Sequence, residues 1–148
     1  MTKSSRLFLL PDINVWLALT YDRHVRHQIA RRWFDHLAPG ARLFFCRLTQ
    51  LGLLRLLCSA DVMGPDLAKG PQEARKAYDT WLQDERIEFV EEPPGLESKF
   101  RALNRPAQAS PKEWADSYLL AFAAAADLRL VTFDPALRQT EANLLLLE

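Results

Sequence analysis

Three aspartates fall at positions where their carboxylates could meet. Asp12 follows Pro11, which ends the apolar run at residues 7–10, and Asp134 follows a second apolar run at 128–132. Asp116 lies near the start of an apolar segment that leads into that second run. If both runs are parallel strands and the segment is a helix, all three aspartates lie at the carboxyl edge of the sheet, where open α/β sheets bind ligands. The spacing therefore predicts an acidic cluster built from three separate segments.

Gathered carboxylates repel one another unless protons or a cation neutralise them. At neutral pH a hard divalent cation is the usual solution, and Mg²⁺ takes one or two carboxylates while keeping positions for water and phosphate oxygens. Mg²⁺, or Mn²⁺ in its place, lowers the pKa of a bound water and screens a phosphodiester. The cluster therefore predicts metal-assisted hydrolysis of a phosphodiester, with three catalytic metal ligands: Asp12, Asp116 and Asp134.

Each aspartate also has a simpler interpretation. Asp12 could only cap the following helix, Asp116 could be one more surface acid, and Asp134, which precedes a proline, could be a turn residue. Two neighbouring polar side chains, Asn14 and Thr132, could orient the carboxylates by hydrogen bonding. The location of the acids on one predicted edge favours the cluster over three separate explanations.

The elements that would position these aspartates alternate between strands and helices. Short apolar runs predict strands at residues 6–10, 43–46, 87–90, 128–132 and 144–147. Helices are predicted between them at residues 24–37, 49–57, 73–82, 96–103 and 111–126. This alternation predicts an α/β fold, a three-layer α/β/α sandwich around a mostly parallel sheet of about five strands.

Three of these helices carry clear local signals. The first has apolar residues at every fourth position, which define one helical face: Val25, Ile29, Trp33 and Leu37. The second is predicted to be capped by Thr49. Ser110 and Glu113 form a capping-box pattern with Pro111 at the first helical position. The helix that carries Asp116 is therefore predicted to begin at Pro111.

The composition is that of one globular domain, residues 1–148. The 148 residues are 49% hydrophobic and 26% charged, which excludes a disordered or fibrous chain. Nineteen basic residues balance nineteen acidic ones, which disfavours binding of nucleic acid through bulk positive charge. Residues 1–74 nevertheless hold ten Lys and Arg against six Asp and Glu. Six arginines make most of that excess, and they form either a solvated helix face or a patch that contacts phosphates. They are Arg23, Arg26, Arg31, Arg32, Arg42 and Arg47.

The sequence predicts a soluble, cytoplasmic protein without a membrane segment. The apolar run Leu7–Leu10 ends at Pro11 and is too short for a signal peptide. The longest apolar stretch, residues 118–126, is about half of the roughly 20 residues that a membrane span needs. Cys46 and Cys58 each lie in an apolar run, so they are predicted to be buried, reduced thiols and not a bridge or a metal site.

The chain resembles the PIN-domain ribonucleases in four segments. They contain the three aspartates and lie, in order, at residues 9–19, 49–57, 115–121 and 130–134. The first segment, LLPDINVWLAL, is similar to the opening of the family's domain, and the second is similar to a subgroup, the VapC-type toxins. Each motif is short, but their order and spacing are specific, and the resemblance spans nearly the whole chain.

The resemblance implies a Mg²⁺-dependent endoribonuclease that is the toxin of a type II toxin–antitoxin pair. Such proteins are usually homodimers, are silenced by a small antitoxin protein that covers the site, and cut structured RNAs such as tRNA or rRNA. Asp12 and Asp116 match the family's main metal ligands. Asp134 matches the position that completes the cluster, directly or through water.

Gln50 departs from the family pattern, which commonly has a Glu early in this helix. Glutamine can orient a water but adds no charge, so the site should hold one Mg²⁺ more readily than two; the side chain could also face solvent. This departure keeps open a PIN-fold binding module with weak or no activity. A phosphatase or a receiver-like protein is a further alternative. A phosphatase of the dehalogenase type needs D-x-D, but the chain has Asp12-Ile13-Asn14. A receiver needs a lysine near the last strand, but no lysine follows Lys112.

Overall fold

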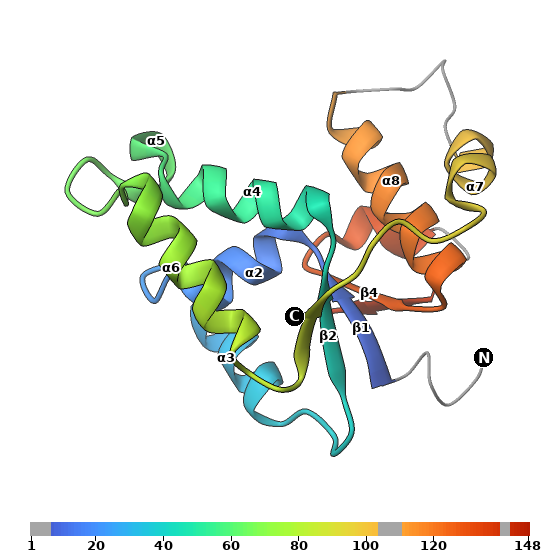
Figure 1. Cartoon of the computed structure of the whole chain (residues 1–148), viewed down its shortest axis with the longest axis horizontal. Helices are drawn as coiled ribbons and strands as arrows, with labels where there is room; N and C mark the ends of the chain where they lie inside the picture. The colour runs from blue at the N-terminus through green and yellow to red at the C-terminus, as the bar shows by residue number, and fades with distance from the viewer. Residues whose placement is uncertain (1–6, 104–110, 140–142) are drawn as a thin grey trace.

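The computed structural model describes residues 7–103, 111–139 and 143–148. Its central feature is a sheet in the order β3-β2-β1-β4-β5, in which every neighbouring pair of strands is parallel (Figure 1). The strands are β1 (Phe8–Pro11), β2 (Arg42–Phe45), β3 (Ile87–Phe89), β4 (Arg129–Thr132) and β5 (Leu144–Leu146). The α/β class predicted from the sequence is confirmed, with a sheet that is parallel throughout the described strands.

Helices cover both faces of the sheet, as predicted (Figure 1). One layer holds α2 (Ile13–Thr20), α3 (His27–Asp35), α4 (Arg47–Leu57), α5 (Ala60–Met63) and α6 (Pro71–Leu82). The other layer holds α7 (Leu96–Leu103) and α8 (Pro111–Ala126). A 3₁₀ helix, η2 (Pro135–Gln139), follows β4.

The path of the chain creates a switch point between β1 and β4. From β1 the chain moves outward to β2 and β3 through helices on one face, and it returns through α7 and α8 on the other face to β4. The segments that follow β1 and β4 therefore diverge from neighbouring strands at the same edge of the sheet. Open α/β sheets bind ligands at such points, and the segments here begin with Asp12 and Phe133.

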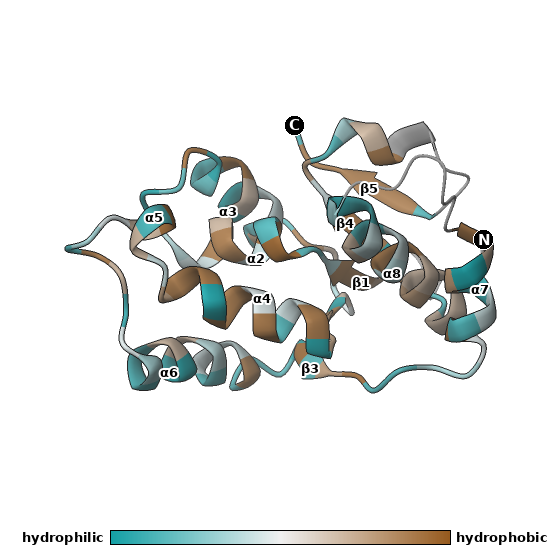
Figure 2. Ribbon diagram, turned by 90° about the horizontal axis from the view of Figure 1, so that it is seen from above, coloured by the Kyte–Doolittle hydropathy of each residue, from teal (hydrophilic) through white to brown (hydrophobic). Residues whose placement is uncertain are grey.

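The sheet divides the hydrophobic core into two parts. Leu9 packs into the layer of α2 to α6, and its neighbour Leu10 packs into the layer of α7 and α8, because successive side chains of a strand point to opposite faces. β1 is hydrophobic along its length, as a strand covered on both faces should be (Figure 2). On the first face, Trp16 stacks on Phe45 with ring centroids 3.9 Å apart, which joins α2 to β2 directly below the switch point.

The helix predicted at residues 24–37 begins later than predicted, at His27. Val25 was predicted to lie on its buried face, but the side chain is 93% exposed. The backbone N–H of Arg26 donates to Nδ1 of His24 at 3.0 Å. Such a local bond holds the backbone in a turn and competes with helix formation, so the segment before His27 bends away from the core.

The helix after β2 begins at Arg47, two residues earlier than predicted, and Cys46 is its N-cap. Thr49 closes the cap from the third helical position, where its Oγ1 accepts from the Cys46 N–H at 3.0 Å. Cys46 is buried, as predicted, but Cys58 is exposed and that prediction was wrong. Cys58 follows the core residue Leu57, and one residue of helical rotation, about 100°, turns its side chain toward solvent.

The remaining predicted boundaries agree with those of the structure to within two residues. The bounds of α7 and α8 are those predicted. No helix was predicted between residues 57 and 73, but this segment contains the short helix α5. The predicted N-cap Ser110 lies outside the described residues. Among the helices that the structure describes, none is long and apolar enough to cross a membrane.

Candidate active site at the switch point

Asp12 connects β1 to α2 and has two structural contacts. Its Oδ1 accepts from the backbone N–H of Val15 at 3.0 Å and so caps α2. Its Oδ2 accepts from the hydroxyl of Thr132, at the end of β4. Asp12 therefore does cap the helix, as considered from the sequence. The cap holds the carboxylate at the edge of the sheet, so capping and a place in a functional site are compatible.

Thr132 joins the two strands of the switch point. Its side chain is fully buried, and while it donates to Asp12 it accepts from the backbone N–H of Asp134 at 3.1 Å. Oδ1 of Asp134 in turn accepts from the N–H of Ala136 at 2.9 Å, which forms the turn into η2. Thr132 was predicted to orient Asp134, and it contacts that residue through the backbone N–H. Its bond to a carboxylate is the one to Asp12, which was not predicted.

Asp116 approaches the same place from the other layer. It lies in the second turn of α8, and its side chain is 25% exposed. Lys112, one helical turn earlier, places its Nζ 2.6 Å from Oδ2 of Asp134 and 4.0 Å from Oδ2 of Asp116. The helix therefore contributes one acid and one base to the same cluster.

These groups surround one open cavity of about 500 Å³ at the carboxyl ends of β1 and β4. Three segments line it: the start of α2 with the turn that precedes α3, the first turns of α8, and the segment after β4. The lining residues are Asp12, Asn14, His24, Val25, Arg26, Lys112, Asp116, Phe133, Asp134 and Pro135. The three predicted acids and Asn14 are therefore brought together.

Gln50 is the predicted site residue that the structure does not bring to this cavity. It lies in the first turn of α4, and its Oε1 accepts from Nη1 of Arg47. Gln50 is absent from the residues that line the cavity, so its amide has a local partner on its own helix.

Five lining residues were not assigned to a site from the sequence: His24, Val25, Lys112, Phe133 and Pro135. The signal for Lys112 was present, because residues four apart on a helix share a face, and Lys112 precedes Asp116 by four. The other four lie in turns or at the start of η2, where periodicity gives no guidance. Arg26, predicted only as part of a basic patch, reaches the cavity wall with its guanidinium 4.9 Å from the ring centroid of Phe133.

The three carboxyl groups differ in their electrostatic environments. Burial raises the pKa of Asp12, against the hydrogen bonds from Thr132 and Val15, and the charge of Asp116 raises it further. Burial also raises the pKa of Asp116, with the Lys112 ammonium acting in the opposite direction. The hydrogen bond from Lys112 lowers the pKa of Asp134. Two acids thus carry unfavourable charge, while the third is neutralised by an internal cation.

The donor set fits a hard divalent cation. Carboxylate oxygens are the ligands that Mg²⁺ and Mn²⁺ prefer, and a cation would relieve the burial and repulsion that raise the pKa of Asp12 and Asp116. Within the described parts of the chain, no three His, Cys, Asp or Glu side chains already stand together as a ligand set. The residues therefore fit an ion held by one or two carboxylates and water better than a closed cage.

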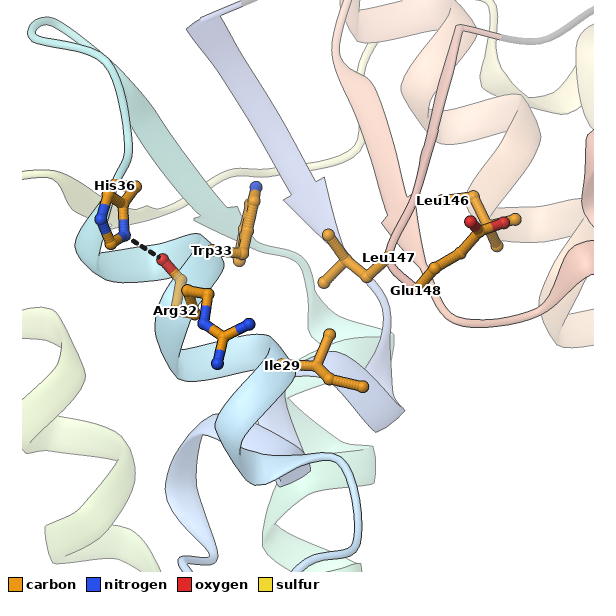
Figure 3. A pocket seen from close by; sticks show the side chains of 7 residues that line it. All are labelled: Ile29, Arg32, Trp33, His36, Leu146, Leu147 and Glu148. Carbon is orange, nitrogen blue, oxygen red and sulfur yellow. Dashed lines mark hydrogen bonds between the residues drawn. The ribbon is translucent and has the colours of Figure 1, made fainter.

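A second cavity, of about 390 Å³, lies between α3 and residues 146–148 at the end of β5 (Figure 3). Its lining is mainly apolar, and the labelled side chains are Ile29, Arg32, Trp33, His36, Leu146, Leu147 and Glu148. Nδ1 of His36 donates to the backbone oxygen of Arg32 at 2.8 Å. Glu148 is the acidic residue of this lining, so this cavity does not contain a cluster of acids like the one at the switch point.

Comparison with known proteins concerns nearly the whole chain. The PIN domain family matches residues 9–143. Ribonuclease VapC41 of Mycobacterium tuberculosis (strain ATCC 25618 / H37Rv) is 44% identical over 137 residues, which cover 88% of this chain and 92% of the relative. Ribonuclease VapC44 of the same strain is 33% identical over 138 residues, which cover 88% and 89%.

The fold also matches a solved structure, that of VapBC2 from Rickettsia felis bound to a DNA fragment from their promoter. The TM-score is 0.70 at 12% identity, over 95% of this chain and 99% of that chain. At this low sequence identity, the structural likeness supports only the fold, whereas the sequence matches identify the family. The chain thus belongs to the PIN-domain family and, within it, to the VapC ribonucleases.

Proposed function

We propose that this protein is a Mg²⁺-dependent endoribonuclease and the toxin of a type II toxin–antitoxin pair. The observation that carries the proposal is the convergence of Asp12, Asp116 and Asp134 on one cavity at the switch point. Relatives named as ribonucleases at 44% and 33% identity support the RNA substrate. Mn²⁺ is expected to replace Mg²⁺, because both prefer carboxylate and water oxygens.

In the proposed mechanism, Asp12 and Asp116 would hold the cation, and Asp134 would support it directly or through water. When bound, the cation supplies Lewis-acid chemistry, lowering the pKa of a water and screening the phosphodiester. Thr132 keeps two of the acids at a fixed separation through its bonds to Asp12 and to the backbone of Asp134. Asn14 lines the same cavity, where its amide is available to orient a carboxylate or a water.

Phosphate binding is assigned to the wall opposite α8. Arg26 lines the cavity, and its contact with the ring of Phe133 helps to hold the guanidinium there. Arginine donors bind phosphate oxygens well. An RNA strand crossing the acids would therefore meet one fixed cation beside the reacting phosphate, which compensates for the absence of a bulk positive charge.

The proposed partners are an RNA, a cognate antitoxin and a second copy of the chain. A structured RNA such as tRNA or rRNA is the substrate that the family resemblance suggests, and cleavage would take place in the cytoplasm. The fold likeness to the VapBC2 complex supports a protein partner, and the family resemblance suggests that this partner is an antitoxin that covers the cavity. A homodimer follows from the same resemblance.

The decisive experiment incubates the purified full chain with total cellular RNA in Mg²⁺, in Mn²⁺ and in EDTA. Asp12→Asn is the matched control, because asparagine keeps the size of the side chain and removes its charge. Discrete fragments that need the cation and are absent with Asp12→Asn would support the nuclease, and mapping their ends would identify the RNA. Cleavage that persists undiminished in Asp12→Asn would overturn the assignment of this cavity.

The alternative is a PIN-fold binding module with weak or no activity. One observation favours it: Lys112 already neutralises one acid of the cluster. The same incubation, combined with a filter-binding assay, distinguishes the two proposals. A binding module would retain RNA on the filter but would produce no fragments in either cation.

A further inference from the structure

Lys112 is the internal cation of the acidic cavity. Its ammonium lies 2.6 Å from Asp134 and 4.0 Å from Asp116, and it comes from the same helical face as the latter. The side chain is 65% exposed. An ion pair that exposed contributes little to folding, typically about 0–1 kcal/mol. The contact is therefore better explained by what it does to the charge of the cavity than by what it does for the fold.

The charges of the cluster can be balanced from its members. Three carboxylates line the cavity, and Lys112 is bonded to one of them. Arg26 also lines it, but its guanidinium lies over the ring of Phe133. Among the described side chains, no cation contacts Asp12, and Asp116 has only the more distant Lys112 ammonium, which is bonded to Asp134. Two such charges match one divalent ion.

We propose that Lys112 acts as a tethered cation that occupies Asp134 and restricts the cavity to a single divalent ion. This inference rests on the proposed function, because it assumes that the cavity binds Mg²⁺ or Mn²⁺. Lys112 is then a positioning residue that sets metal stoichiometry and affinity. Its ammonium repels an entering divalent ion and keeps Asp134 from binding that ion directly, so that Asp134 is left with a supporting role through water.

Removing that charge should make the cavity a stronger metal site. In Lys112→Met, Asp134 loses its bound cation and becomes available as a ligand, while the long apolar side chain preserves the bulk of the lysine stem. We expect Mn²⁺ to bind about tenfold more tightly, the order of magnitude that one nearby charge contributes at a partly exposed site, or to bind as two ions. Lys112→Arg keeps the charge and should retain the wild-type affinity and stoichiometry.

The test is a calorimetric titration of the full chain with MnCl₂ at low ionic strength. Lys99→Met is the matched control, since Lys99 is an exposed lysine on α7 that does not line the cavity. Melting in EDTA verifies that each variant is folded, and Lys112→Gln replaces Lys112→Met if the latter does not fold. Tighter or two-ion binding in the neutral variants, with no change in Lys112→Arg and Lys99→Met, supports the inference.

Two results would contradict the inference in different ways. If the wild-type chain binds Mn²⁺ and the neutral variants bind it equally or more weakly, Lys112 only supports Asp134, and the proposed nuclease stands. If neither the wild-type chain nor any variant binds Mn²⁺, the proposed metal-dependent function and the role of Lys112 both fail.

Discussion

Asp12 has two hydrogen-bonding contacts that the fold uses and a charge that the fold does not need. One oxygen caps α2 and the other accepts from Thr132, but burial and the neighbouring Asp116 raise its pKa. The bonds stabilise the native chain, whereas the charge destabilises it when no cation is present. Active sites commonly keep such unfavourable groups for function.

This division predicts different stabilities for two inactive variants. Asp12→Asn keeps a side-chain oxygen for the cap and an N–H₂ that can bond to Thr132, whereas Asp12→Ala loses both contacts. In EDTA at neutral pH, we expect Asp12→Asn to be more stable than Asp12→Ala by about 1–2 kcal/mol and at least as stable as the wild type. Urea unfolding measures both differences, and equal midpoints for the two variants would show that the bonds contribute nothing.

Thr132, at the end of β4, affects the pKa of the same carboxyl group. Its hydroxyl lowers the pKa of Asp12 against the effect of burial, so Thr132→Val should raise that pKa further. Protons would then compete with the cation up to a higher pH, and the pH at which Mn²⁺ binds should shift upward. The unpaired N–H of Asp134 should also cost about 1–3 kcal/mol of stability.

The pH dependence of Mn²⁺ affinity, measured in parallel for three proteins, tests this prediction. Thr132→Ser is the matched control because it restores the hydroxyl and should restore the wild-type profile. A profile for Thr132→Val that coincides with that of the wild type would remove Thr132 from the control of Asp12.

At the scale of elements, α2 is held close to α4 by a glycine. A Cβ on Gly52 would lie 2.5 Å from Cδ1 and 2.7 Å from Cγ1 of Ile13, the residue after Asp12. Ile13 is β-branched, so its χ1 angle has little freedom in a helix. The glycine therefore sets how closely α4 approaches Ile13 at the start of α2.

Gly52→Ala should destabilise the protein by about 1–3 kcal/mol through overpacking, although alanine is the better helix former by about 1 kcal/mol. Ile13→Ala creates room for the new methyl group, so the double variant should recover part of the loss. A double-mutant cycle in urea gives the coupling energy directly. Additive effects of the two substitutions would mean that α2 and α4 adjust independently.

The elements themselves were predictable where local and long-range signals agree. α8 has proline at its first position and a long apolar stretch, and its bounds match the prediction. α3 was predicted to begin too early, because Val25 continues its apolar period, whereas the bond from Arg26 to His24 holds the residues before His27 in a turn. Periodicity cannot reveal such a side-chain bond, and Val25 consequently faces solvent.

At the scale of the whole molecule, the sequence predicted the meeting of distant acids because strand direction limits where they can go. Parallel strands place Asp12 and Asp134 on one edge whatever their neighbours do, and α8 must begin at that edge to lead into β4. The reach of Lys112 to Asp134 depends on side-chain conformation across two elements, which no sequence pattern determines. Gln50 shows the converse, since its family position did not predict its contact with Arg47.

The stability of the entire domain should respond to the cation in a pH-dependent manner. The pKa values of Asp12 and Asp116 are raised above 3.8 in the fold, so the stability that their neutral forms contribute is present below pH 3.8 and is lost as the pH rises through the folded values. Asp134, whose pKa is lowered, contributes stability above pH 3.8 that is lost as the pH falls through its folded value. Above pH 3.8 the first effect governs, and the chain in EDTA should lose stability as these two acids ionise.

Saturating Mg²⁺ should reverse this loss, because it binds the ionised acids. At a concentration of 100 times its Kd, the ion adds about 2.7 kcal/mol, which corresponds to an increase in Tm of roughly 5–10 °C for a domain of this size. Melting curves from pH 4 to pH 8 should therefore show a difference between Mg²⁺ and EDTA that widens as the pH rises. In Asp116→Asn the difference should shrink at every pH, because one ligand charge is gone. A difference that is constant with pH, or largest at pH 4, would show that the ion stabilises the chain somewhere other than at Asp12 and Asp116.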